Sequence, residues 1–196
     1  MGPILVLYYS RSGATKNLAL KIAQGIEQEG CEARLRTVPM ISDNLQAVQP
    51  GVPKQGDPYV QLSDLQQCSA LALGSPTRFG NMAAAMKYFW DSTSSDWLAG
   101  SLAGKPACVF TSSGSMHGGQ ESTLLSMMLP LLHHGMFLMG LPYTQAELHS
   151  TQTGGSPYGA THVAGINGNK LLSVEEQRLC IAQGQRLAQL SKKLEN

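Results

Sequence analysis

Short apolar runs alternate along this chain with segments in which apolar residues recur every three or four positions. The first run, ILVLY at residues 4–8, is continuously apolar, which is typical of a strand buried on both faces of a parallel sheet. The apolar residues that follow it fall on one face of a helix: Leu18, Ala19, Ile22, Ala23 and Ile26. Gly30 gives that helix its stop signal. The beginning of the chain therefore predicts a strand followed by an amphipathic helix.

The same alternation continues to the end of the chain. Further strands are predicted at residues 33–38, 70–73, 107–111 and 136–140, and further helices at 62–66, 82–91 and 120–133. Ser173 and Glu176 are spaced as a capping box, which predicts the start of a last helix. Five strands that alternate with helices predict an α/β fold, a doubly wound parallel sheet with helices on both faces.

Two stretches, residues 39–61 and 142–170, do not fit this alternation. Irregular connections of that length are uncommon in a compact domain unless they serve a function or are disordered. The second stretch contains GGSPYGATHVAG, but we expect no strand to lead into its glycines, so it does not predict a dinucleotide-binding fingerprint. The chain has 196 residues, 42% of them hydrophobic, and no linker-like segment, so residues 1–196 are expected to form a single domain with two long inserts.

Charge is nearly balanced along the chain, with 14 Lys and Arg residues, 13 Asp and Glu residues and a formal net charge of +1. There are no basic or acidic blocks, so neither a nucleic acid nor an anionic membrane surface is an expected partner. Residues 124–141 are apolar, but Pro130 and Gly135 interrupt them together with two histidines, so no membrane span is predicted. The expected partners are small molecules.

The cysteines are widely spaced and form no C-x-x-C motif: Cys31, Cys68, Cys108 and Cys180. This spacing predicts neither a disulfide framework nor a metal site, and it fits a reducing compartment. The chain begins MGPILVLYYS, which has no basic segment of the kind that opens a signal peptide. We therefore expect a cytoplasmic protein.

Three of the predicted strands lead directly into segments rich in glycine and hydroxyl groups. These segments are SRSGAT at residues 10–15, SPTRFGN at residues 75–81 and SSGSMHGG at residues 112–119. In an open parallel sheet, ligands bind outside the carboxyl ends of the strands, where the strand order reverses. We therefore expect the three segments to lie at one edge of the sheet and to form one binding site.

The first segment has the groups that hold a phosphate. Ser10, Ser12 and Thr15 stand at the start of a helix whose first N–H groups have no partner within the helix, and Gly13 allows a ligand close to the backbone. A cluster of residues that only caps the helix would explain the same pattern equally well. The lysine of a nucleoside triphosphate loop is missing, which argues against a Walker site.

The second segment combines rigid backbone with a cation and an aromatic ring. Pro76 and Thr77 are expected to hold backbone donors in place, while Arg78 and Phe79 lie beside the planar ring that would extend from the phosphate. The alternative is a surface turn in which Asn81 caps the next helix.

The glycines of the third segment, Gly114, Gly118 and Gly119, allow backbone N–H groups to contact a polar ring edge. An ordinary Gly/Ser turn is the alternative for this segment alone. The occurrence of three such segments after three strands makes a ligand site the better interpretation.

These residues resemble one family closely, the WrbA type of NAD(P)H:quinone oxidoreductases, which are flavodoxin-like FMN proteins. The resemblance covers nearly the whole chain and is carried by LVLYYS, GSPTRFGNM, GKPACVF, HGGQE, LLHHGM, PYGATH and the helical end that follows LSVEE. It implies a flavodoxin-like sheet of five parallel strands in the order 2-1-3-4-5. It also implies a homotetramer in which neighbouring subunits complete each site.

The activity that the resemblance implies is the two-electron reduction of quinones by NADH or NADPH through tightly but non-covalently bound FMN. The mechanism would be ping-pong, with hydride transfer through flavin N5. Two other functions are considered, a one-electron carrier flavodoxin and a redox-responsive regulatory protein that binds flavin. Carriers usually dock through a strongly acidic face, and the near-neutral charge of this chain therefore disfavours a carrier. Neither a motif nor a charged patch supports a regulator.

The resemblance also implies roles for individual residues. The FMN phosphate would be bound by Ser10, Arg11, Ser12, Gly13, Ala14 and Thr15. The isoalloxazine would be flanked by Pro76, Thr77, Arg78, Phe79 and Gly80. The ribityl chain and the pyrimidine edge would contact Ser112, Ser113, Gly114, Ser115, Met116, His117 and Gly118.

Substrate and proton-handling residues follow from the same resemblance. His133 would lie near the ring, where it would polarise the flavin or supply a proton, and the neighbouring His134 is interpreted as structural. Trp97 would line the substrate pocket together with Phe79 and Arg78. Ser12 departs from the family pattern, because many relatives have an aromatic residue there that stacks on the nicotinamide dinucleotide. Further departures lie in the third segment at Ser113, Gly114 and Met116.

Overall fold

The computed structural model describes residues 1–41, 53 and 55–195. Much of the insert predicted at 39–61 therefore lies outside the described residues. The elements are β1 (Ile4–Tyr8), α1 (Ala14–Gln28), β2 (Ala33–Thr37), α2 (Leu62–Gln67), β3 (Ala70–Pro76), α3 (Ala84–Asp91), α4 (Ser94–Leu98), β4 (Pro106–Ser113), α5 (Gln120–His133), β5 (Phe137–Leu138), α6 (Glu147–Ser150), β6 (Thr161–Val163) and α7 (Val174–Glu195).

The strands form one parallel sheet in the order β2-β1-β3-β4-β5, as predicted. The pairing of β1 with β3 begins where Ile4 lies opposite Ala70, and the pairing of β3 with β4 begins where Leu71 lies opposite Ala107. β3 and β4 run further than the sequence predicted and still pair at Pro76 and Ser112. The ends of these two strands therefore lie side by side and fix the relative position of the loops that follow.

The outer edge of the sheet differs from the prediction. β5 has two residues instead of the five predicted. It pairs only with the start of β4, where Phe137 lies opposite Pro106. β6 is a sixth strand inside the insert at 142–170. It pairs with the end of β4, where Thr161 lies opposite Thr111. After Met139, whose N–H donates to the Ala107 carbonyl oxygen, the chain leaves β4, and the Leu141 N–H donates instead to the Pro157 carbonyl oxygen.

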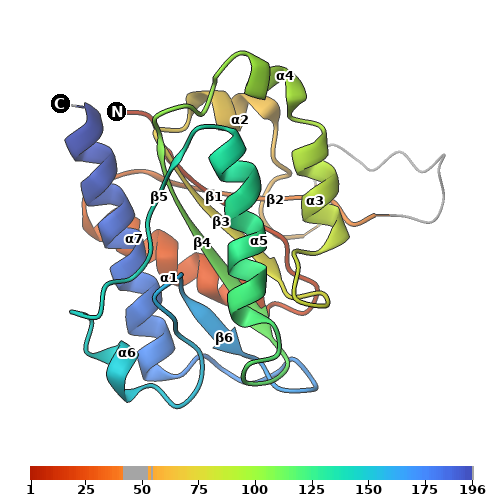
Figure 1. The fold of residues 1–196 in the computed structure, drawn as a ribbon, viewed down its shortest axis with the longest axis vertical. Helices are drawn as coiled ribbons and strands as arrows, with labels where there is room; N and C mark the ends of the chain where they lie inside the picture. The colour runs from red at the N-terminus through yellow and green to blue at the C-terminus, as the bar shows by residue number, and fades with distance from the viewer. Residues whose placement is uncertain (42–52, 54, 196) are drawn as a thin grey trace.

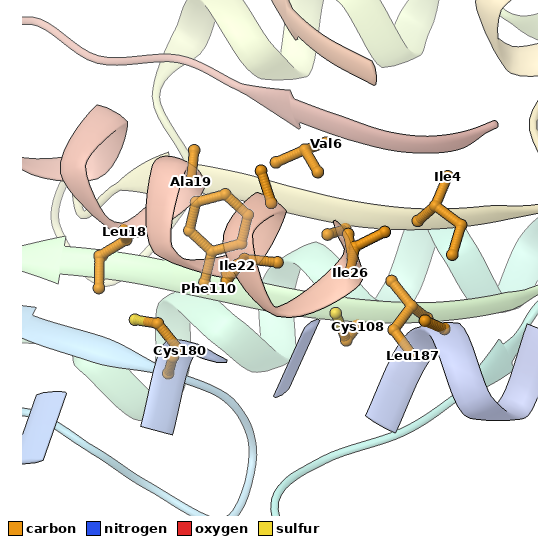
Figure 2. Packing of buried hydrophobic residues seen from close by; sticks show 14 of the residues in the cluster. Ile4, Val6, Leu18, Ala19, Ile22, Ile26, Cys108, Phe110, Cys180 and Leu187 are labelled. Carbon is orange, nitrogen blue, oxygen red and sulfur yellow. The ribbon is translucent and has the colours of Figure 1, made fainter. Parts of the chain in front are cut away.

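Helices cover both faces of the sheet, and each face buries a separate core (Figure 1). Side chains alternate along β1, so Ile4 and Val6 join one core while Leu5 and Leu7 join the other. Figure 2 shows the first core, in which residues of α1 and α7 pack against Phe110 and its neighbours on the sheet. Burial on both faces explains why the strands read as continuous apolar runs.

Two glycines bring α1 and α7 into direct backbone contact. A Cβ atom at Gly25 would lie 2.1 Å from the carbonyl oxygen of Ile181, and one at Gly184 would lie 2.1 Å from that of Ile22. Any larger residue would force the helices apart. This contact fixes the axis of α1, and thereby the position of its N-terminus at the candidate site.

The capping box predicted for the last helix is confirmed. The Ser173 N–H donates to Glu176 Oε2 at 2.8 Å, and the Glu176 N–H donates to Ser173 Oγ at 3.1 Å. Within the described part of the chain, none of the helices has the length and apolar character needed to cross a membrane.

Candidate functional site

The three predicted loops meet at the carboxyl edge of the sheet, in the lower half of Figure 1. They follow β1, β3 and β4, and β1 stands between β2 and β3 in the strand order. This is the switch point at which open α/β sheets bind ligands. A hollow of about 180 Å³ lies between the loops, lined by Ser10, Arg11, Ser12, Ala14, Thr15, Pro76, Thr77, Arg78, Ser112, Ser113, Gly114, Ala164, Gly165, Ile166 and Gly168.

Hydrogen bonds between hydroxyl groups hold the loops together. Thr15 Oγ1 lies 2.8 Å from Ser112 Oγ, which joins the first loop to the third, and both residues are buried. The Thr77 N–H donates to the Ser112 carbonyl oxygen at 2.9 Å. The hydroxyl of Thr123, on α5, donates to Thr77 Oγ1 at 2.8 Å. The site is thus a connected polar network with fixed geometry, and not three independent surface turns.

The first loop presents an open helix N-terminus. Gly13 precedes α1 with φ +94°, and a Cβ atom there would meet nothing within 4 Å. No side chain caps α1 at this residue, and Ser10 Oγ instead accepts the Gly13 N–H at 3.1 Å. The simple capping interpretation therefore does not describe this loop. Free N–H groups, two serine hydroxyls and the helix dipole remain available for an anion, so the donor set and the open space fit the phosphate of FMN.

The second loop is a tight turn with an exposed ring at its tip. Arg78 and Asn81 exchange backbone hydrogen bonds of 2.7 and 3.0 Å. Between them Phe79 has φ +52°, a left-handed conformation that is strained for a bulky residue, and its side chain is fully exposed. The alternative in which Asn81 caps the next helix is wrong, because α3 begins after Ala83.

A broader hollow of about 730 Å³ adjoins the second loop. Its walls include Tyr9, Phe79 and Met82, and Arg11 and Arg78 line both this hollow and the smaller one. The larger hollow lies beside the phosphate-binding loop and has apolar walls with two cations at the junction. Such a surface can accept a flat ring that extends from a bound phosphate.

The third loop divides into two parts. Ser112, Ser113 and Gly114 line the smaller hollow, whereas Ser115, Met116, His117 and Gly118 form the turn into α5 and do not line it. His117 has φ +55° and is exposed beside Glu121. Gly118 is packed so tightly that a Cβ atom would lie 2.4 Å from Ser115 Oγ. The turn is therefore compact, and only its first part lines the smaller hollow.

His133 and Trp97 do not meet these loops within one chain. α5 begins beside the third loop and ends at His133, so its 14 residues separate the two by about 20 Å. The carbonyl oxygen of His133 accepts the indole N–H of Trp97 at 2.8 Å. Both residues line another hollow of about 400 Å³, whose walls come from α3, α4 and the end of α5. Within one chain, His133 thus lies at the opposite end of α5 from the third loop.

His134 is structural, as the sequence suggested. Its ring is buried and lies 3.0 Å from Thr93 Oγ1 through Nε2. The Thr93 hydroxyl already donates to the Trp90 carbonyl oxygen, so it accepts the Nε2–H of His134. Burial lowers the pKa of His134, and the neutral ring packs edge-on against Trp90.

One part of the site was missed in the sequence. Ala164, Gly165, Ile166 and Gly168 line the smaller hollow, because β6 ends at the same edge of the sheet as β4. The available signal was the short run ATHVA between two glycines, which contains β-branched residues but is too short for a periodic pattern.

Comparisons with known proteins agree with this geometry. Residues 3–147 match the family model described as NADPH-dependent FMN reductase. A protein of Gluconacetobacter diazotrophicus named NAD(P)H dehydrogenase (quinone) is 39% identical over 99% of each chain. A protein of Solidesulfovibrio magneticus with the same name is 40% identical over 97% of this chain and 98% of its own length.

Solved structures show the same fold. A WrbA-like flavodoxin from Agrobacterium tumefaciens superposes with a TM-score of 0.71 at 22% identity, covering 98% of this chain and 99% of that one. Flavodoxin 2 from Bacillus cereus superposes with a TM-score of 0.63 at 17% identity, covering 96% and 99%. The fold and the three loops define a flavodoxin-like α/β protein. The chain belongs to the family that the sequence indicated, the WrbA-type NAD(P)H:quinone oxidoreductases.

Proposed function

We propose that this protein binds FMN non-covalently and tightly at the three loops and reduces quinones with NADH or NADPH in a two-electron, ping-pong reaction. Bound FMN would supply the redox chemistry, accepting a hydride at N5 from the nicotinamide and delivering two electrons to the quinone, which takes up protons to become the hydroquinone. The observation that carries the proposal is the convergence of an uncapped helix N-terminus, a rigid aromatic turn and a glycine-rich turn at the switch point of the sheet.

The chain's own groups divide the ligand between them. The residues of the first loop, Ser10–Thr15, would bind the phosphate through hydroxyl and backbone N–H groups, with the Arg11 guanidinium as counter-charge. Pro76 to Gly80 would flank the ring, with Phe79 at its open side. The backbone of Ser112, Ser113 and Gly114, the part of the third loop that lines the smaller hollow, would donate to the ring edge that becomes more negative on reduction.

The open side of the larger hollow explains how two substrates could use one site. The hollow is lined by Arg78 and Phe79 from the second loop and by the start of α3 from Met82 to Lys87. Its volume of about 730 Å³ lies in the usual range for small-molecule sites. A nicotinamide and a quinone would bind there in turn, each stacking against the same face of the ring, which is the physical basis of a ping-pong sequence.

An apolar face of α5 supports assembly into the homotetramer that the family resemblance implies. Leu125, Leu129 and Leu132 are all exposed and follow one another at helical spacing on one face of α5. Phe137 and Trp97, which is 48% exposed, lie beyond the end of the same helix. A second copy packed on this face would bring its Trp97 and His133 toward the loops of the first copy. There His133 could supply a proton or polarise the ring.

The state of the cysteines agrees with a cytoplasmic location, which we also propose. All four cysteines are buried and unpaired. Burial raises the pKa of the Cys68 thiol to about 11 and that of the Cys108 thiol to about 12, so both stay protonated at neutral pH. Protonated, buried thiols suit a reducing compartment and take no part in the redox reaction.

Steady-state kinetics with NADH or NADPH and benzoquinone test this function. A ping-pong enzyme gives parallel lines in double-reciprocal plots when one substrate is varied at several concentrations of the other. Intersecting lines would contradict the ping-pong order. Negligible turnover with either nicotinamide, in a protein that retains FMN, would point to a one-electron carrier or a regulator and contradict the proposed activity.

A further inference from the structure

We propose that residues 164–168, which follow β6, are a fourth FMN-binding segment that covers the phosphate and ribityl part of the ligand. We further propose that the buried pair His162 and Glu176 positions this segment. The inference rests on the proposed FMN site. It goes beyond the three loops because it gives a binding role to part of the insert at 142–170.

The segment joins two of the other loops. The Ala164 N–H donates to the Ser113 carbonyl oxygen at 2.8 Å, which fixes one end of the segment to the third loop. At the other end Gly168 lies against the first loop, since a Cβ atom there would come within 3.0 Å of Ser12 Oγ. The segment therefore closes the side of the hollow between Ser12 and Ser113, where the phosphate and the ribityl chain would lie.

The backbone of the segment is shaped to offer donors. Gly168 donates to the Gly165 carbonyl oxygen at 2.9 Å, and Lys170 donates to that of Ala164 at 3.0 Å, so the segment is a closed turn. Both glycines have positive φ, +77° and +65°. Among the described residues, the N–H groups of Gly165, Ile166 and Asn167 have no acceptor. Successive free N–H groups in a turn of this kind are suited to an anion.

A buried, hydrogen-bonded pair of side chains, His162 and Glu176, holds the turn in place. His162 Nδ1 lies 2.8 Å from Glu176 Oε2, and His162 Nε2 lies 3.0 Å from the carbonyl oxygen of Lys170. Both side chains are 1% exposed. Each ring nitrogen of His162 therefore lies within hydrogen-bond distance of an oxygen atom, so the ring links Glu176 to the backbone at Lys170. Loss of His162 would therefore release Lys170, and with it the end of the turn.

The carboxylate of Glu176 ties the same turn to the rest of the fold. It accepts the N–H groups of Gly154 at 2.8 Å, Val163 at 3.2 Å and Ser173 at 2.8 Å, besides the His162 ring. Burial alone would raise the pKa of Glu176, but the hydrogen bonds from His162 and the backbone outweigh it and hold the pKa below its ordinary value. The insert, β6 and the start of α7 are thus joined at one ionised group.

Charge placed at Ile166 tests the binding role of the segment. Ile166 lines the hollow and its side chain is 98% exposed, so Ile166→Asp and Ile166→Lys should both fold. Apoprotein is titrated with FMN and with riboflavin, which lacks the phosphate, and the quenching of flavin fluorescence gives each Kd. Ile166→Asp should raise the Kd for FMN about fivefold, and Ile166→Lys should lower it. The Kd for riboflavin should change little in both variants. Matched control variants are Leu194→Asp and Leu194→Lys at the other end of α7.

The outcomes separate this inference from the proposed function. If the wild-type protein binds FMN and the Ile166 variants bind it as the Leu194 variants do, the fourth segment has no binding role. If the wild-type protein does not bind FMN at all, the proposed function itself fails.

A second variant tests the positioning role of His162. His162→Ala should raise the Kd for FMN about tenfold and leave the Kd for riboflavin nearly unchanged. The reason is that the displaced turn would lose several N–H contacts to the phosphate. Imidazole added to this variant can occupy the vacated space and donate to both acceptors, so it should restore FMN binding. An equal loss of affinity for FMN and riboflavin, without rescue by imidazole, would show that His162 supports only the fold.

Discussion

The indole N–H of Trp97 donates a 2.8 Å hydrogen bond to the carbonyl oxygen of His133, at the end of α5 that lies away from the three loops. The bond joins the two residues at the end of α5 opposite the third loop. Their proposed role in the reaction requires a second copy of the chain. Assembly and turnover should consequently be linked.

We predict that Leu129→Asp separates the subunits and impairs catalysis. Leu129 is 60% exposed on the apolar face of α5, and burying a carboxylate between two copies would be strongly unfavourable. Sedimentation should show a 20.9 kDa species, and quinone turnover should fall at least about tenfold while FMN binding persists. Leu20→Asp, on the exposed side of α1, is the matched control and should change neither property. A Leu129→Asp protein that stays assembled and active would rule out this face as the interface.

Phe79→Ala should reduce turnover without releasing FMN. The Phe79 ring is exposed at the tip of the second loop and makes no stabilising core contact, so its removal should leave the fold intact. Loss of one stacking contact is expected to lower kcat/KM about tenfold, with the FMN Kd within about twofold of wild type. Tyr88→Ala removes another exposed aromatic ring, on α3, and serves as the control. Unchanged kinetics for Phe79→Ala would remove this residue from the substrate pocket.

Gly184→Ala should destabilise the fold, although alanine is the better helix former. At Gly184 the added methyl group would collide with the Ile22 carbonyl oxygen and force α1 away from α7. Overpacking of this kind typically costs about 1–3 kcal/mol. Denaturant unfolding measures the change, with Gln24→Ala at an exposed position of α1 as the control. A gain in stability would show that the helices are not in backbone contact.

Glu176→Gln should lower stability at neutral pH by about 1–3 kcal/mol, since a neutral amide replaces the buried carboxylate that is hydrogen-bonded to His162 and accepts three backbone N–H groups. The pKa of Glu176 is lower in the folded protein than its ordinary value of 4.5. Its contribution to stability is therefore fully present above pH 4.5 and is lost as the pH falls through the lower, folded-state pKa.

Urea unfolding of the wild-type protein and the Glu176→Gln variant across this pH range checks the sign of that linkage. The stability difference between them should be constant near neutral pH and shrink on acidification. A difference that grows on acidification would mean that Glu176 is protonated in the folded protein.

The local parts of this architecture follow from the sequence. The run at 4–8 is the observed β1, and the capping box at Ser173 and Glu176 forms as expected, because the pattern that predicts each one lies within a few neighbouring residues. The three loops meet as predicted, since parallel strands deliver their carboxyl ends to one edge. These features depend on hydrophobic periodicity and on local hydrogen-bonding chemistry.

Long-range relationships could not be predicted in this way. β6 has only three residues, too few for a periodic pattern, so the fourth wall of the hollow was missed. His133 is distant from the loops because α5 runs back along β4, which motif matching does not reveal. The contact between His162 and Glu176 joins residues whose chemistry is visible in the sequence but whose proximity depends on the tertiary fold.

Titration of the apoprotein with FMN shows most directly whether the three loops hold one FMN molecule. We expect one FMN per chain with a Kd below about 1 μM, and markedly weaker binding of riboflavin, because the open N-terminus of α1 binds the phosphate. Absence of saturable FMN binding, or equal affinity for FMN and riboflavin, would mean that the loops do not form the proposed site.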